Sequence, residues 1–280
     1  MVLVMPARGT KLAHAGRGLG YKPDGRHKLG LPYPDAAPKL AALPAAGSLG
    51  TMDIDAAVGE VVNQGGAPFC FANAPLQAIR ALQVLNGASP VPELGSRLWV
   101  VYFAHALEHD VESFDGGIIS DAFEAIQKLG LPPEHIWPYS DDPNGPYKTK
   151  PSAEAYREAF DAIAPFHATR ILTEGGRRID DIRKALAARL PIVFGTQVTE
   201  DFCENKLGPD FTVDVPQDQP LAGGHALMGS GDDPANARVR VPNSWGPNWG
   251  DNGRCWFTYA YMEWVLTEDI WVVDFTGRRA

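Results

Sequence analysis

The sequence predicts an α+β fold with two lobes, one helical and one built of strands. Apolar residues recur at helical spacing in several runs up to about residue 165, whereas later segments are short, aromatic or β-branched, and separated by Gly, Pro, Asn and Asp. A helical half followed by a strand half is typical of this class. With 280 residues, 45% of them hydrophobic, the chain can bury a sizeable core.

The predicted elements follow one another in that order. Residues 1–50 are rich in Gly, Ala and Pro without periodicity, which indicates an irregular extension or linker. Residues 51–280 form the main domain, with a helical lobe at about 51–165 and a strand lobe at about 166–280. Helices are expected after Cys70 and at 96–109, 118–130, 152–162 and 179–189. Strands are expected at 166–172, 191–198, 225–231, 237–245, 254–261 and 269–275.

Composition excludes several classes of protein. A net charge of −9 and a pI near 5.2 argue against a general nucleic-acid binder. No apolar run is long enough to cross a bilayer, and the apolar N-terminal stretch is too short for a secretory signal, so a cytoplasmic protein is expected. Three cysteines do not indicate a disulfide scaffold. A pair between Cys203 and Cys255 is the one that spares Cys70, but we expect all three to be reduced.

Cys70 is the candidate nucleophile. It lies at the predicted start of a helix, where free N–H groups and the positive end of the helix dipole favour a thiolate. The thiolate is the reactive form, so this position suits covalent catalysis. A free Cys is also a common packing residue. A base, an orienting group and oxyanion donors must therefore accompany it.

His225 and Asn243 could supply the base and the orienting group. His225 begins a predicted strand after two glycines, which allow another chain or a ligand to approach closely. Asn243 ends the next strand, and a neutral amide can fix an imidazole through one ring nitrogen. Trp245 could shield that hydrogen bond from water. Each feature alone is ordinary in a folded core, but their occurrence together with Gln64 and Cys70 favours a catalytic site.

Three motifs resemble those of papain-family cysteine peptidases: NQGGAPFCFANA at 63–74, GGHALMGSG at 223–231 and NSWGPNWGDNG at 243–253, with a weaker fourth, DGGIISDAFEAI, at 115–126. Their order along the chain matches the family. The resemblance spans roughly residues 51–275 and implies a papain-like fold, in which an active-site cleft separates a helical lobe from an antiparallel, β-barrel-like lobe. Residues 1–50 lack the long charged helix of an inhibitory propeptide, and the chain looks more like bacterial members.

The chain departs from the family around the nucleophile. Pro68-Phe69-Cys70-Phe71 replaces the family's Gly-Ser-Cys-Trp. Ala67 and Phe114 stand where the family has a disulfide, so that bond is absent, consistent with a reducing compartment. We expect Pro68 and Phe69 to narrow or stiffen the cleft wall.

The resemblance implies a function and assigns roles to residues. Cys70 and His225 would form a thiolate–imidazolium pair oriented by Asn243, and peptide bonds would be hydrolysed through a thioester. The side chain of Gln64 would hold the oxyanion together with the backbone N–H of Cys70. No cofactor is implied, and the partner is a peptide or protein substrate, with no nucleic acid and no membrane. The substrate-binding residues implied are Gly117, Ile118, Ile119, Gly195, Gly224, Ala226 and Trp245, which suggest a preference for an apolar residue before the cleaved one.

Alternatives remain open from the sequence. The same thioester could be passed to an amine, as in a transpeptidase or acyltransferase, or the scaffold could be a catalytically silent peptide-binding module. His105 and His109 have a zinc-ligand spacing, but Ala106 replaces the Glu that a metalloprotease needs. GRGLGY at 16–21 follows no strand, so it does not predict a nucleotide site. Residues 1–50 are turn-rich, and one hypothesis is that they pack on the lobes or cover the cleft.

Overall fold

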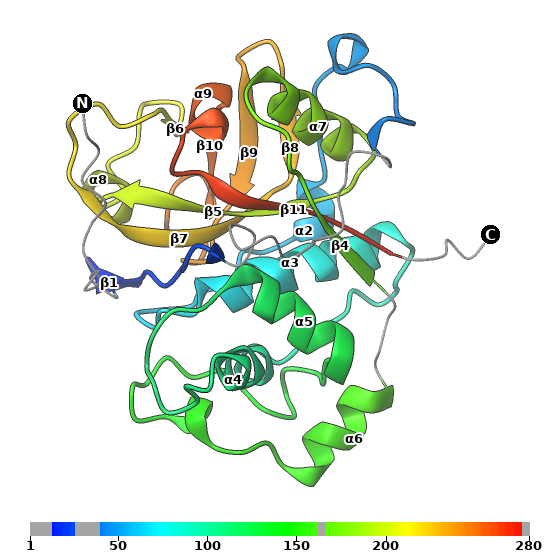
Figure 1. The fold of residues 1–280 in the computed structure, drawn as a ribbon, viewed down its shortest axis with the longest axis vertical. Coiled ribbons are helices and arrows are strands. Elements are labelled where there is room, and N and C mark those ends of the chain that lie inside the picture. The colour runs from blue at the N-terminus through cyan, green and yellow to red at the C-terminus, as the bar shows by residue number, and fades with distance from the viewer. Residues whose placement is uncertain (1–12, 26–39, 162–165, 276–280) are drawn as a thin grey trace.

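Two lobes lie one above the other in the protein, as the computed structural model shows for residues 13–25, 40–161 and 166–275 (Figure 1). Helices α4, α5 and α6 occupy the lower half of this view and the sheets the upper half, with α3 between them. The predicted α+β architecture with a helical lobe and a strand lobe is confirmed.

The predicted helices form close to the expected positions. Ser96 caps its helix by accepting a hydrogen bond from the backbone N–H of Trp99 at 3.2 Å, and Gly130 ends the following helix with a φ of 77°. None of the helices in the described ranges has the length and apolarity of a membrane span. The helices before residue 162 are α2 (Asp55–Val58), α3 (Cys70–Leu85), α4 (Arg97–Leu107), α5 (Ile119–Leu129) and α6 (Ala153–Asp161), with the 3₁₀ turns η2 (Ala46–Ser48) and η3 (Pro146–Lys148).

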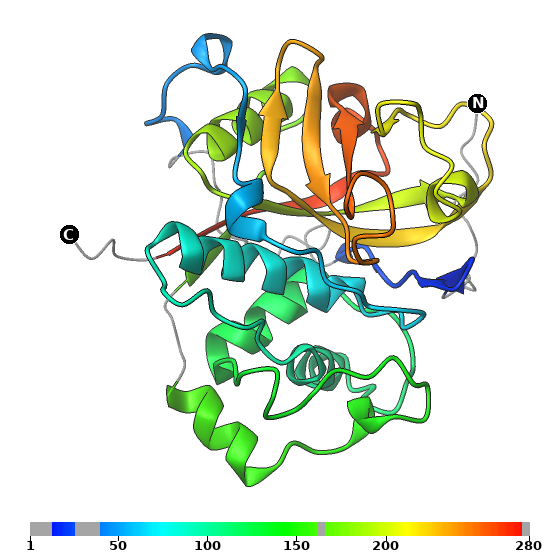
Figure 2. The ribbon, with the colours of Figure 1, turned by 180° about the vertical axis from the view of Figure 1, so that it is seen from behind.

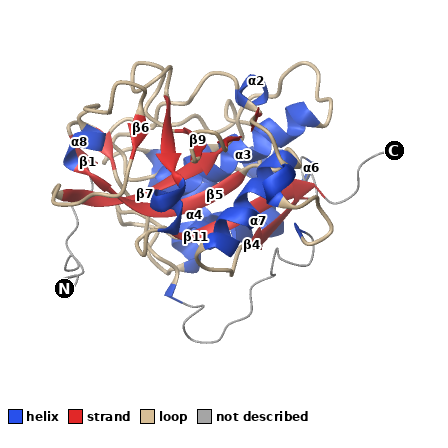
Figure 3. Cartoon of the chain, turned by 90° about the horizontal axis from the view of Figure 1, so that it is seen from above, coloured by secondary structure: helices blue, strands red, loops and turns tan. Residues whose placement is uncertain are grey.

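Two sheets build the strand lobe. One has the order β4-β11-β5-β7 with antiparallel neighbours, and its strands cross the molecule side by side when seen from above (Figure 3). The other has the order β3-β8-β9-β10-β6, in which β10 and β6 run parallel. The strands are β3 (Met52–Asp53), β4 (Phe166–Arg170), β5 (Ile192–Thr199), β6 (Thr212–Val213), β7 (Leu221–Gly229), β8 (Gly231–Asp233), β9 (Arg238–Pro242), β10 (Arg254–Thr258) and β11 (Glu268–Phe275).

Three further helices and a small hairpin complete the fold. Helix α7 (Gly176–Ala187) was expected, whereas α8 (Glu200–Cys203), α9 (Tyr259–Glu263) and the hairpin of β1 (Ala13–His14) and β2 (Arg17–Gly18) were not. The strand predicted over 254–261 ends at Thr258. Its side chain accepts a hydrogen bond from the backbone N–H of Tyr261 at 3.2 Å and starts α9. A local side-chain cap therefore overrides the aromatic, strand-like composition.

Phe69 belongs to the core of the helical lobe. Its side chain is fully buried, and its ring centroid lies 5.3 Å from that of Phe114 and 5.6 Å from that of Tyr147. The expectation that Phe69 narrows the cleft wall is wrong, because the ring packs inside the lobe. Phe114, at the position of the missing disulfide, packs against it.

We expect Phe69→Ala to lower the free energy of unfolding by about 3–5 kcal/mol, since it leaves a cavity in a packed aromatic cluster. Phe69→Leu should cost clearly less, because most of the volume remains filled. Urea unfolding of both variants in a Cys70→Ala chain, which removes self-cleavage, measures the difference. Equal, small losses for both variants would show that the ring is not a core element.

Candidate active site

Cys70 reaches the strand lobe from the first turn of α3. The residue is completely buried, and its Sγ accepts a hydrogen bond from the backbone N–H of Ala226 at 3.3 Å. Ala226 lies on β7, directly after His225. The contact therefore places the sulfur against the strand that carries the predicted base.

His225 is held by Asn243 and covered by Trp245. Nε2 of His225 lies 2.8 Å from Oδ1 of Asn243, and the indole of Trp245 stacks on the imidazole at 4.5 Å and 20°. Oδ1 of Asn243 also accepts the backbone N–H of Ser244 at 2.7 Å, which fixes the amide. Nδ1 of His225 has no hydrogen-bond partner among the described residues. It is the nitrogen free to exchange a proton with a thiol.

Gln64 links the loop before Cys70 to the loop after Asn243. Its backbone N–H donates to the carbonyl of Ser244 at 2.8 Å, and its Oε1 accepts the Ser244 hydroxyl. Nε2 donates to the carbonyl of Ala67 at 2.8 Å and to that of Gly18 at 3.2 Å. The amide proposed as an oxyanion donor thus already binds two backbone carbonyls, one in its own loop and the other, that of Gly18, in a distant part of the chain.

That carbonyl belongs to a segment, residues 17–24, that runs between the lobes and is called the strap below (Figure 2). The strap bonds to the helical lobe through Gly18 N–H to the Gly65 carbonyl at 2.9 Å and Lys22 N–H to the Gly117 carbonyl at 3.0 Å. It bonds to the strand lobe through the N–H of Tyr21 and the carbonyl of Gly224 at 3.1 Å. Both lobes therefore hold the same stretch of backbone.

Glycines let the strap lie directly on the loop before the nucleophile. A Cβ added to Gly18 would overlap the carbonyl oxygen of Ala67, and one added to Gly20 would overlap that of Pro68. The backbone N–H of Gly20 acts to lower the pKa of the Cys70 thiol. The glycines of the motif at 16–21 thus allow the strap backbone to lie directly against the backbone of another loop.

Burial favours the neutral forms of Cys70 and His225 in this arrangement. It raises the pKa of the Cys70 thiol to about 11, although hydrogen bonds from the N–H groups of Ala226 and Gly20 act in the opposite direction. It lowers the pKa of His225 to about 4, opposed by the hydrogen bond to Asn243. From the sequence we expect the helix N-terminus to favour a thiolate at Cys70. In the structure the loss of water around the thiol has the larger effect on its pKa.

The other predicted binding residues surround the strap or the pair. Gly117 and Gly224 bond to the strap backbone, and Gly195 lies against the ring of Tyr21. Ile119 is buried in α5, and Ile118 is its half-buried N-cap residue. Sequence reasoning did not assign Gly18, Gly20, Tyr21 or Asp269.

His105, one of the two histidines at zinc-like spacing, has a structural role here. Its Nε2 lies 3.2 Å from the carbonyl of Gly116, and its ring centroid is 5.5 Å from that of Phe71. The contact supports the Gly116-Gly117 backbone on which the strap lies. All three cysteines are buried and free.

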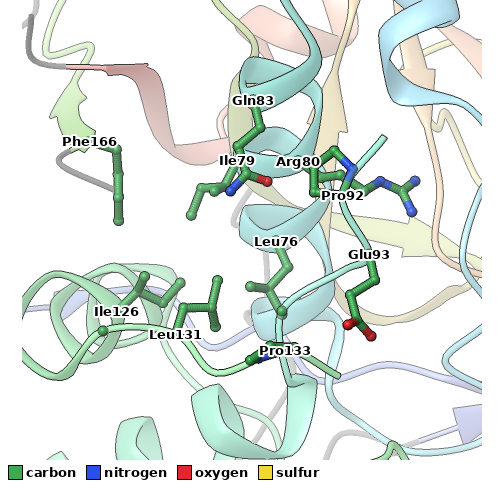
Figure 4. Close-up of a pocket in the computed structure, with 12 residues that line it drawn as sticks. Leu76, Ile79, Arg80, Gln83, Pro92, Glu93, Ile126, Leu131, Pro133 and Phe166 are labelled. Carbon is green, nitrogen blue, oxygen red and sulfur yellow. The ribbon is translucent and has the colours of Figure 1, made fainter. Parts of the chain in front are cut away.

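A separate hollow of about 320 Å³ lies on the helical lobe, away from Cys70 (Figure 4). Leu76 and Ile79 of α3 face Ile126 and Leu131 across it, with Arg80 and Glu93 among the lining residues. None of the predicted site residues lines it. This hollow is therefore not part of the candidate active site.

Comparisons with known proteins find cysteine proteases similar to this chain. Residues 51–265 match a family model described as papain family cysteine protease. An uncharacterized peptidase C1-like protein of Acanthamoeba polyphaga mimivirus is 32% identical over 220 residues, which cover 76% of this chain and 69% of that protein. A cathepsin B-like protein of Giardia intestinalis is 27% identical, covering 69% of this chain and 62% of that protein. Xylellain, a cysteine protease from Xylella fastidiosa, superposes with a TM-score of 0.79 at 29% identity, over 98% of this chain and 100% of that chain.

We expect alkylation of Cys70 by iodoacetamide in the intact chain to rise without a plateau as pH approaches about 11, because the neutral thiol predominates below its raised pKa. In Gly20→Ala, whose Cβ would push the strap off Pro68, water reaches the thiol and the midpoint should move to lower pH. Mass spectrometry of the Cys70 peptide measures the rate. The control is Gly25→Ala, since a Cβ there meets open space. Identical pH profiles in all three chains would contradict the assignment.

Proposed function

The chain belongs to the papain family of cysteine proteases, and we propose that it hydrolyses peptide bonds with Cys70 as nucleophile and His225 as base, and that the strap inhibits it until displaced. The observation that carries the proposal is the joint placement of the two residues. Sγ of Cys70 accepts a hydrogen bond from the backbone N–H of Ala226, the residue after His225. Oδ1 of Asn243 lies within hydrogen-bonding distance of Nε2 of His225.

The reaction would proceed in two halves. Nδ1 of His225 takes the proton of the Cys70 thiol, and the sulfur attacks the carbonyl carbon of the substrate. The oxyanion is held by the Gln64 side chain and the backbone N–H of Cys70. His225 then gives its proton to the leaving amine as the carbon–nitrogen bond breaks. The acyl group of the substrate remains on Cys70 as a thioester. Water, deprotonated by His225, attacks the thioester and releases the acid and the thiol.

Asn243 and Trp245 would support this cycle without touching the reacting carbonyl. The hydrogen bond to Asn243 engages Nε2 and would fix the ring so that Nδ1 can serve the sulfur as base. The stacked indole excludes water from that bond and so strengthens it. Displacement of the strap lets water and substrate approach the pair, which reduces the desolvation that keeps it neutral.

The strap would inhibit by occupying the positions of a substrate. Its Gly18 carbonyl takes the amide of Gln64, and its backbone takes the hydrogen-bonding groups of Gly117 and Gly224. The backbone N–H of Gly20 acts on the Cys70 thiol in the direction that favours the ionised form. The strap would therefore block the approach of a substrate carbonyl to Cys70.

We expect Gly20→Ala to raise peptidase activity at least about tenfold over the wild-type chain, a weakening of strap binding by about 1.4 kcal/mol. The matched control, Gly25→Ala, should behave as wild type, because its Cβ meets nothing within 4 Å. Initial rates on an unstructured protein such as casein measure the change. Equal rates for both variants would remove the inhibitory role of the strap.

The catalytic assignment is tested in the Gly20→Ala chain. Adding Cys70→Ala or His225→Ala should abolish turnover, and adding Gln64→Ala should lower it by about 10²–10³, as for the loss of one oxyanion donor. Rates unaffected by Cys70→Ala would eliminate the mechanism. Supplying a free amine and analysing the products by mass spectrometry distinguishes hydrolysis from acyl transfer.

A further inference from the structure

The side chain of Tyr21 fills a pocket beside the catalytic pair. It is 6% exposed, and its hydroxyl donates a hydrogen bond of 2.6 Å to Oδ2 of Asp269. The ring occupies the space in which a Cβ of residue 195 would stand, so Gly195 makes room for it. Tyr21 is therefore a built-in example of what this pocket accepts.

Asp269 forms the polar floor of the pocket. It is 2% exposed and lies in β11 where the pairing with β5 shifts register between Glu268 and Trp271. Its φ is 51°, which is uncommon for a residue other than glycine. A register shift of this kind turns a side chain in a new direction, and such positions concentrate at functional sites.

Arg170 sets the charge of this floor. Its guanidinium pairs with Oδ1 of Asp269, and both side chains are nearly completely buried. The pair is neutral as a whole. The carboxylate of Glu268 also acts on the Tyr21 hydroxyl, in the same direction as that of Asp269. A lysine or arginine entering the pocket would meet the guanidinium as well as these carboxylates, whereas a hydroxyl donor meets no such repulsion. The group that occupies the floor is a neutral hydroxyl donor.

Oδ2 of Asp269 accepts hydrogen bonds from the strap. Among the described residues, its donors are the Tyr21 hydroxyl and the backbone N–H of Asp24, the latter at 2.8 Å. Displacing the strap removes both donors and leaves a carboxylate oxygen short of partners, which is unfavourable at a buried position. A substrate hydroxyl restores one of them, but a phenylalanine or leucine side chain does not.

We propose that, once the strap is displaced, the pocket of Gly195, Ala226 and Asp269 selects peptides with tyrosine at the residue that precedes the one carrying the cleaved carbonyl. This inference rests on the proposed function, and it narrows the apolar preference expected from the sequence to an aromatic ring with a hydroxyl donor. A site built to bind a hydroxyl discriminates more strongly against an analogue that lacks it than an apolar pocket discriminates by size.

The full chain carrying Tyr21→Ala tests the inference, because the substitution empties the pocket and leaves its walls intact. Four fluorogenic dipeptide amides, differing in having Tyr, Phe, Leu or Arg as the first residue, are compared. We expect kcat/KM for Tyr to exceed that for Phe at least about tenfold, as for a hydrogen bond to a charged group, and to exceed that for Arg. Equal values for Tyr and Phe, or a preference for Arg, would overturn the proposal.

Two pocket variants in the same chain separate the hydroxyl from the ring. Asp269→Asn keeps the shape and removes the charge, so the preference for Tyr over Phe should fall several-fold. Gly195→Ala places a methyl group where the ring lies, so Leu should become preferred over both aromatic residues. Melting temperatures of both variants check that they are folded. If the four substrates keep the same order of kcat/KM in both variants, a different part of the protein selects the first residue of the dipeptide.

Inactivation rates separate this inference from the proposed function. Chloromethyl ketones of the same four dipeptides alkylate Cys70 with loss of chloride and need no turnover. Faster labelling by the Tyr reagent, with no substrate cleaved, would support the pocket assignment and eliminate hydrolysis. Equal labelling by all four, with normal cleavage, would overturn the pocket assignment and leave hydrolysis in place.

Discussion

One face of α3 holds the candidate catalytic residues of the strand lobe in place, and the site depends on this contact. Cys70 and Gln77 are two turns apart and so lie on the same side of the helix. The first accepts the N–H of Ala226 at 3.3 Å, and the second donates its side-chain amide to the carbonyl of Asn243 at 3.0 Å. A single rigid element thus fixes the strand that carries His225 and the loop that orients it.

The same contact makes the reactivity of the site depend on its access to water. A thiol and an imidazole buried together between two lobes are each destabilised in the charged form, which is why the pKa of Cys70 rises and that of His225 falls. The strap completes this burial and contributes a carbonyl to Gln64. Inhibition by the strap would therefore be electrostatic as well as steric, since it withholds both the substrate position and the ionised nucleophile.

The helices and the residues of the candidate site could be predicted from the sequence because their signals are local. Periodic apolar residues identify α3 and α5, and the motifs around Cys70, His225 and Asn243 are contiguous in the chain. The strap has no periodicity, and its glycines have a meaning only against Ala67 and Pro68. Asp269 was missed for a similar reason, since the irregular register of β11 aims it into the pocket. The roles of the strap and of Asp269 depend on contacts between residues far apart in the chain, and such contacts produce no local pattern in the sequence.

Anchoring of the strap and selection of a substrate draw on the same groups. Tyr21 and Asp24 bind Asp269 of the strand lobe, while the carboxylate of Asp24 accepts the hydroxyl of Ser120 in the helical lobe at 2.6 Å. A tethered side chain is present at an effective concentration that free peptides rarely reach, on the order of millimolar for short flexible links. Modest affinity in each pocket then suffices to keep the strap bound. A better fit of the pocket to tyrosine would strengthen inhibition and substrate selection together, so activation must act on the strap itself.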